Sequence, residues 1–214
     1  MNNKWVKKLI IVAQPSKKWF LWEVAKFYKS ESEKYWDEIE ILDLYSKENF
    51  QPNLEFEDMK VLNDDPNREK FQKKIKEAQE LVFVFPIWWG NMPAILKNFI
   101  DTNFWAGFAY KFQKWSPIPI KLLEWKKARI FTSCDGFKYI YNNYLCPMYL
   151  KKYIEIYILW VFWIELKDFK LYDKMRKKSE PEKKEILNDI ALDIKRTKMT
   201  VDFRKIIKNI IKSK

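Results

Sequence analysis

Short apolar runs alternate with segments of helical periodicity along most of the chain. The apolar runs are rich in β-branched and aromatic residues, which is typical of strands buried on both faces of a parallel sheet. They lie at 8–13, 38–44, 81–85, 128–132 and 165–172. Apolar positions at helical spacing predict the intervening helices, with one more helix after Pro181. These helical patterns lie at 23–34, 67–78, 94–104 and 139–157.

This alternation predicts an α/β sandwich that is doubly wound, with parallel strands in the middle and helices on both faces. Five strands connected in this way indicate a flavodoxin-like sheet with the strand order 2-1-3-4-5. We expect one domain over residues 1–178, followed by a basic C-terminal helical extension over 179–214. The polar segment 45–65 is the one long connection, and long connections in compact domains are commonly functional.

The residue types that the chain lacks exclude several kinds of catalysis. Its 214 residues include no histidine, so neither a Ser-His-Asp triad nor a histidine zinc site can form. Three glycines are too few for a G-x-G-x-x-G or Walker loop. Two cysteines supply neither a disulfide framework nor a four-thiolate zinc site. We expect no metal, and a bound cofactor must therefore carry most of any chemistry.

Of the net charge of +12, residues 174–214 carry +8, so the C-terminal segment is the most basic part of the chain. A basic segment can bind nucleic-acid phosphates or an acidic membrane, but a solvated amphipathic helix is the simpler interpretation. A nucleic-acid partner is therefore not expected. No run approaches the roughly 20 apolar residues of a membrane span, and the first residues lead directly into a strand without the apolar region of a secretion signal. We expect a cytoplasmic protein.

Doubly wound folds bind ligands outside the carboxyl ends of their strands. Three predicted loops meet there, at 14–20, 86–92 and 133–138. The middle loop contains two adjacent indoles, Trp88 and Trp89, whose flat faces suit a planar ring system. The alternative is that both indoles only fill the seam between a helix and the sheet.

The segment FPIWWGNMPAILKNFID at 85–101 closely resembles flavin-dependent NAD(P)H:quinone oxidoreductases of the quinone reductase and modulator-of-drug-activity type. The stretch GFAY at 107–110 and the opening loop at 13–20 are similar to the same family. The resemblance extends from about residue 7 to residue 173. It implies a flavodoxin-like fold, tightly bound FMN or FAD, NADH or NADPH as co-substrate, a quinone-like acceptor and a homodimer.

The resemblance also implies roles for individual residues. First-loop residues would surround the flavin phosphate at a helix start, second-loop residues would pack along the isoalloxazine, and third-loop residues would approach its pyrimidine end. These cofactor-binding residues are Gln14, Ser16, Lys18, Phe20, Pro86, Ile87, Trp88, Trp89, Thr132, Ser133 and Asp135. Phe108 and Tyr110 would form a substrate pocket facing the flavin of the partner subunit. Tyr139 and Tyr141 are the candidates for a catalytic hydroxyl near the ring.

The first loop departs from the family pattern, and so does the glycine content. Gln14 replaces the family's histidine, while Trp19 and Trp22 replace small residues where indoles would obstruct a phosphate. Ordinary usage predicts about 15 glycines in this length, yet the chain has 3 glycines and 11 tryptophans. Seven tryptophans occupy positions that favour glycine: Trp19, Trp22, Trp36, Trp115, Trp125, Trp160 and Trp163. We hypothesise that some of these codons are UGA, read as glycine in the source.

The leading functional hypothesis is a flavoprotein that takes hydride from NADH or NADPH onto flavin N5 and reduces a quinone or similar acceptor. Two alternatives stay open. One is a flavodoxin-like electron carrier, which the basic charge disfavours. The other is a flavin-free binding protein whose basic tail contacts nucleic acid, an interpretation favoured only if Trp19 and Trp22 close the first loop.

Overall fold

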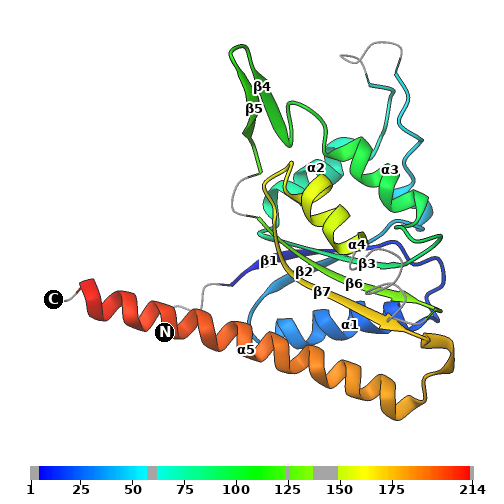
Figure 1. Ribbon diagram of the computed structural model, residues 1–214, viewed down its shortest axis with the longest axis vertical. Helices are drawn as coiled ribbons and strands as arrows, with labels where there is room; N and C mark the ends of the chain where they lie inside the picture. The colour runs from blue at the N-terminus through cyan, green and yellow to red at the C-terminus, as the bar shows by residue number, and fades with distance from the viewer. Residues whose placement is uncertain (1–4, 57–61, 124–125, 137–148, 213–214) are drawn as a thin grey trace.

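The computed structural model describes residues 5–56, 62–123, 126–136 and 149–212, and its centre is a five-stranded parallel sheet (Figure 1). The strand order is β2-β1-β3-β6-β7, which confirms the predicted order among the parallel strands. Every neighbouring pair in this sheet is parallel. The strands are β1 (Lys7–Val12), β2 (Glu38–Asp43), β3 (Glu80–Pro86), β6 (Lys127–Cys134) and β7 (Glu165–Asp173).

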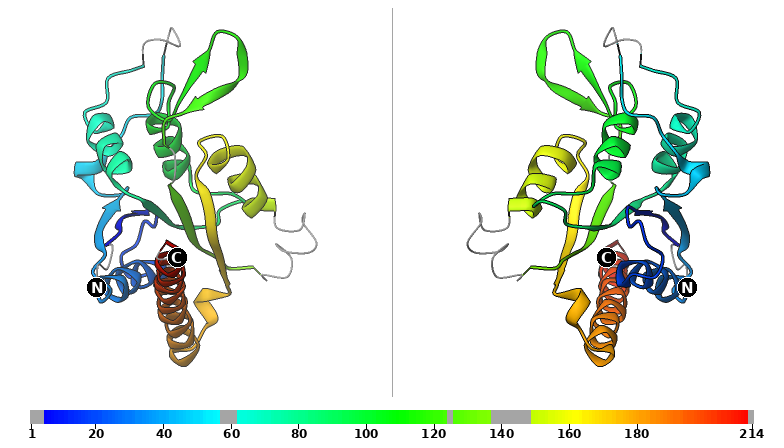
Figure 2. Two further views of the ribbon diagram at one scale, coloured as in Figure 1. Left: turned by 90° about the vertical axis from the view of Figure 1, so that its left-hand side faces the viewer. Right: turned by 90° about the vertical axis from the view of Figure 1, so that its right-hand side faces the viewer.

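Helices cover both faces of the sheet, as the alternation of strands and helices predicts (Figures 1 and 2). One face carries α1 (Phe20–Glu33) and α5 (Glu180–Lys212). The other face carries α2 (Arg68–Glu77), α3 (Ala94–Asn103) and α4 (Tyr149–Lys152), the last continuing as the π-helix η3 (Tyr153–Leu159). Two short 3-10 turns, η1 (Lys47–Asn49) and η4 (Met175–Lys177), follow β2 and β7.

The core forms two layers because strand side chains alternate between the two faces of the sheet. In β1, Leu9 and Ile11 are buried on the side of α2 and α3, while Ile10 and Val12 are buried on the side of α1 and α5. Every residue of β3 is buried, as expected for the central strand of a sheet covered on both faces.

The helix α5 completes the layer formed by α1. At its start, the Ser179 backbone N–H and hydroxyl both donate to Glu182 Oε2, and the first of these bonds is one half of a capping box. Ile190 and Ile194 are buried in the same core cluster as the apolar face of α1. The helix then runs past the edge of the sheet (Figure 1). None of the helices in the described parts of the chain has the length and apolar composition of a membrane span.

Two local features differ from the sequence-based expectation, and a third lies partly outside the described residues. The hairpin of β4 (Tyr110–Gln113) and β5 (Ser116–Lys121), which projects from the body in Figure 2, was not predicted because its two prolines argue against a strand. Helix α1 begins three residues earlier than predicted. The sequence has no signal for this start, because the N-cap residue Trp19 makes no side-chain cap bond. In the helix predicted over 139–157, residues up to 148 lie outside the described residues, and the remainder is helical.

Candidate functional site

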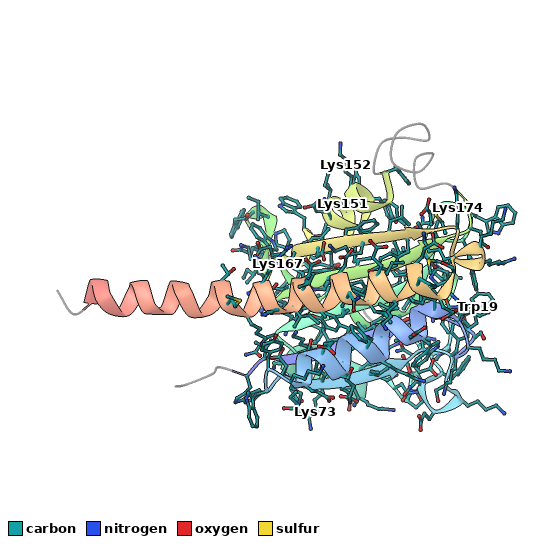
Figure 3. All side chains as sticks on the ribbon, turned by 90° about the horizontal axis from the view of Figure 1, so that it is seen from below. Trp19, Lys73, Lys151, Lys152, Lys167 and Lys174 are labelled. Atoms are coloured by element: carbon teal, nitrogen blue, oxygen red, sulfur yellow. The ribbon has the colours of Figure 1, made fainter. Side chains whose placement is uncertain are left out.

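A cavity of about 320 Å³ opens at the carboxyl ends of β1, β3 and β6, beside the start of α1. Its volume lies within the range of small-molecule sites, and its position is where doubly wound sheets bind ligands. Figure 3 shows Trp19, at the start of α1, at the same edge of the sheet as Lys174, which follows β7. The lining residues are Gln14, Lys18, Trp19, Phe20, Leu21, Pro86, Ile87, Trp88, Ser133, Cys134, Asp135, Met175, Arg176 and Lys183.

Gln14 is the most unusual polar residue of the cavity. It follows the last pairing of β1 with β3, in which the Ala13 N–H donates to the carbonyl oxygen of Val84 at 2.9 Å. The residue is only 1% exposed, and neither its Oε1 nor its Nε2 has a hydrogen-bond partner within the protein. A buried amide without partners is costly. Gln14 therefore offers one acceptor and one donor to a molecule bound in the cavity.

Positive charge prevails along the cavity wall. Among the described residues, Lys18, Arg176 and Lys183 line it together with one carboxylate, Asp135. Arg176 Nε lies 3.0 Å from Asp135 Oδ2. The N-terminus of α1, whose first backbone N–H groups have no intrahelical acceptor, adds a further attraction for anions. The arrangement favours a ligand with an anionic group near the start of α1.

The loop after β3 supplies the apolar wall. The Ile87 N–H donates to the carbonyl oxygen of Ser133 at 2.7 Å, which ties this loop to the end of β6. Trp88 and Asn91 then exchange two backbone hydrogen bonds of 2.9 and 3.0 Å across a tight turn. The two central residues of that turn, Trp89 and Gly90, both have positive φ. As a result Trp88 lines the cavity, whereas the Trp89 side chain is fully exposed to solvent.

The structure brings most of the predicted cofactor-binding residues together at this cavity. The eight that line it are Gln14, Lys18, Phe20, Pro86, Ile87, Trp88, Ser133 and Asp135. Ser16, Trp89 and Thr132 do not line it, and the Thr132 hydroxyl donates instead to the carbonyl oxygen of Phe85 at 2.7 Å. Trp22 was expected to obstruct the phosphate turn, but it does not line the cavity. Its side chain is buried in the core, and its Nε1 donates to the Gln14 carbonyl oxygen at 3.0 Å.

The predicted substrate residues lie elsewhere in the subunit. Phe108 and Tyr110 pack against the core on the α3 side of the sheet and do not line the cavity. The Tyr110 ring stacks on Phe162 with a centroid separation of 6.2 Å. Tyr139 and Tyr141 lie outside the described residues.

Sequence reasoning missed several lining residues, above all Met175, Arg176 and Lys183 from η4 and α5. No local pattern distinguishes these cations from the others in the basic C-terminal segment. Cys134 was also missed. Burial and the nearby carboxylates of Asp173 and Asp135 raise the pKa of this thiol to about 11, so it is protonated at neutral pH and is a weak nucleophile.

A second group of charged residues is buried between the sheet and the α1–α5 layer. Arg129 pairs with Glu80 at 3.1 Å and with Asp168 at 3.0 Å, and the Tyr28 hydroxyl donates to Glu80 at 3.0 Å. Burial opposes the ionisation of Glu80, but the charges of Lys8 and Arg129 outweigh it and lower its pKa. Because these groups satisfy one another, we interpret the cluster as structural.

A family model described as a flavodoxin-like fold matches residues 6–162. The chain belongs to this family.

Two curated relatives in this family share sequence with the chain. The chain is 30% identical over 172 residues to the mouse (Mus musculus) protein named ribosyldihydronicotinamide dehydrogenase [quinone], covering 66% of this chain and 73% of that protein. It is 39% identical over 72 residues to an uncharacterized NAD(P)H oxidoreductase of Haemophilus influenzae, covering 32% of this chain. The match spans about a third, 35%, of the Haemophilus protein. The mouse protein is named as a dehydrogenase and the Haemophilus protein as an oxidoreductase.

Solved structures share the fold of the chain. Smu.1420 from Streptococcus mutans superposes with a TM-score of 0.74 at 29% identity, covering 89% of this chain and 99% of that one. An FMN-dependent NADH-azoreductase from Bacillus anthracis, solved in complex with FMN, superposes with a TM-score of 0.64 at 17% identity, covering 91% and 99%. At the latter identity, the likeness concerns the fold alone.

Proposed function

We propose that this chain is a flavin-dependent NAD(P)H dehydrogenase that reduces a quinone or a similar acceptor. The observation that carries the proposal is the unpartnered, buried amide of Gln14 in a cavity with cationic walls. It lies at the ligand-binding edge of a fold whose curated relatives include an NAD(P)H oxidoreductase and a ribosyldihydronicotinamide dehydrogenase [quinone]. A bound flavin supplies hydride acceptance from NADH or NADPH at N5 and two-electron transfer to the acceptor.

The residues present fit a flavin. Lys18, Arg176 and Lys183 would hold its phosphate together with the backbone N–H groups at the start of α1. Trp88 and Ile87 would pack along the ring, orient it and exclude water from that side. FMN, rather than FAD, is the flavin that we propose. The same fold binds FMN in the Bacillus anthracis azoreductase, and the cavity is small for a dinucleotide.

We also propose a homodimer. The β4–β5 hairpin exposes Phe112, Ile118 and Ile120, and a cluster of exposed apolar residues on a projecting hairpin is typical of an interaction surface. Phe108 and Tyr110, at the base of this hairpin, would then contribute to the acceptor pocket of the partner subunit. A cytoplasmic location accords with NAD(P)H as co-substrate and with the free Cys134.

Reconstitution with FMN, followed by kinetics, tests the proposal. The protein should quench FMN fluorescence on binding and then oxidise NADH or NADPH steadily in the presence of a benzoquinone. Lys18→Ala, at the cavity wall before α1, should weaken FMN binding, whereas Lys26→Ala, at an exposed position within α1, should not. Binding without turnover would indicate an electron carrier instead. Failure to bind either flavin would refute the proposal.

A further inference from the structure

Four residues other than glycine have a positive φ in the described parts of the chain, and three of them are tryptophans. These are Trp36 at +65°, Trp89 at +52° and Trp163 at +58°. The left-handed region is sterically unfavourable for any residue with a Cβ atom, and for a bulky residue it is a rare outlier. Tryptophan thus accounts for most of the non-glycine residues that adopt a left-handed backbone in the described parts of the chain.

Trp163 occupies a helix-ending position that glycine usually takes. After η3, the Ile164 N–H donates to the Leu159 carbonyl oxygen at 2.9 Å, and the Trp163 N–H donates to that of Trp160 at 3.0 Å. This pair of bonds defines a Schellman motif, in which the residue corresponding to Trp163 adopts the left-handed conformation and is usually glycine. The Schellman motif therefore requires the positive φ of +58° at Trp163.

Trp36 occupies the corresponding place after α1. Its N–H donates to the Glu33 carbonyl oxygen at 3.0 Å, and its left-handed backbone turns the chain toward β2, which begins two residues later. The side chain is 74% exposed, so little burial of the indole offsets the unfavourable backbone. Glycine would form the same turn without strain.

We propose that positions 36 and 163 are glycine in the protein made by its source, where the codon written here as tryptophan is UGA and is read as glycine. The composition supports this independently, because 11 tryptophans stand beside only 3 glycines. The backbone geometry also shows which of the described tryptophan positions do not require glycine. Trp160 lies only three residues before Trp163 but has an ordinary right-handed φ of −63°, so its backbone does not require glycine.

Peptide mass spectrometry of the protein purified from its source tests the proposal directly. The peptides that contain positions 36 and 163 should have the mass of glycine at each. Tryptophan at either position overturns the proposal for that position.

The physical basis is tested separately in recombinant protein with tryptophan at every written position. Trp36→Gly should have a folding equilibrium constant about 5- to 30-fold higher than Trp36→Ala, because both variants remove the indole and only alanine keeps the Cβ atom in the left-handed backbone. Trp163→Gly should exceed Trp163→Ala in the same way. At the control position 160, Gly should be less stable than Ala. Alanine variants as stable as the glycine variants at 36 and 163 would overturn the structural argument.

Discussion

Replacing Gln14 by methionine should have opposite effects on the flavin-free protein and on flavin binding. The side chain is 1% exposed and both of its polar atoms lack a partner, which costs about 1–3 kcal/mol in a flavin-free protein. Methionine has a similar length and no amide. Gln14→Met should therefore raise the free energy of unfolding of the flavin-free protein by about 1–3 kcal/mol.

The same change should weaken flavin binding. If Oε1 and Nε2 each make one hydrogen bond to the ligand, their loss removes about 1–3 kcal/mol of binding free energy in total. That corresponds to a dissociation constant for FMN that is about 5- to 150-fold larger. Because a ligand stabilises the folded state according to its affinity, saturating FMN should narrow or reverse the stability difference between the two proteins.

Urea unfolding of the flavin-free protein, followed by far-ultraviolet dichroism, measures the first effect, and FMN fluorescence titration measures the second. Asn103 is the matched control, because it is also fully buried but its amide donates to Phe99 O and Gln51 Oε1. Asn103→Leu should lower the free energy of unfolding by about 1–3 kcal/mol. A Gln14→Met protein that is less stable without flavin, or that binds FMN as tightly as the parent, would refute the role assigned to this amide.

Three further outcomes follow from the described geometry. Trp88→Ala should weaken FMN binding in a fluorescence titration with little change in far-ultraviolet dichroism. Trp115→Ala, at the exposed hairpin tip, should leave the affinity for FMN unchanged. Equal effects of the two changes would contradict the assignment of Trp88. Burial lowers the pKa of Lys126 to about 8, so the unfolded chain binds more protons between about pH 8 and pH 10.5. Over that interval the free energy of unfolding, measured with urea, should rise by about 2 kcal/mol more in the parent than in Lys126→Met. Parallel pH profiles of the two proteins would contradict this. The pKa of Cys134 is raised to about 11, so at pH 8 this thiol should react with iodoacetamide far more slowly in the folded protein than after unfolding. Peptide mapping measures the labelling, and fast labelling of the folded protein would show the thiol to be activated.

Local sequence patterns determined the layers of this protein and much of its site. Continuous apolar runs mark strands buried on both faces, and their alternation with helical periodicity leaves few topologies to consider. Because ligand sites in such sheets lie beyond the carboxyl ends of the strands, the positions of Gln14, Ile87, Trp88 and Ser133 after predicted strands are enough to group them. The tertiary structure places all four at one cavity.

Only the tertiary structure showed which residues distant in sequence line the cavity, which buried polar atoms lack a partner, and which backbone positions are left-handed. Arg176 and Lys183 reach the cavity from the far end of the chain, and a contact across that sequence separation leaves no mark in local periodicity. The missing partners of Gln14 can be recognised only when every neighbouring atom has a position. Likewise, the sequence pointed to seven tryptophans at positions that favour glycine, but only the φ angles identified Trp36 and Trp163 as those whose backbone is left-handed. A backbone dihedral depends on how a helix ends and where the next strand begins, and that is a property of the packed fold.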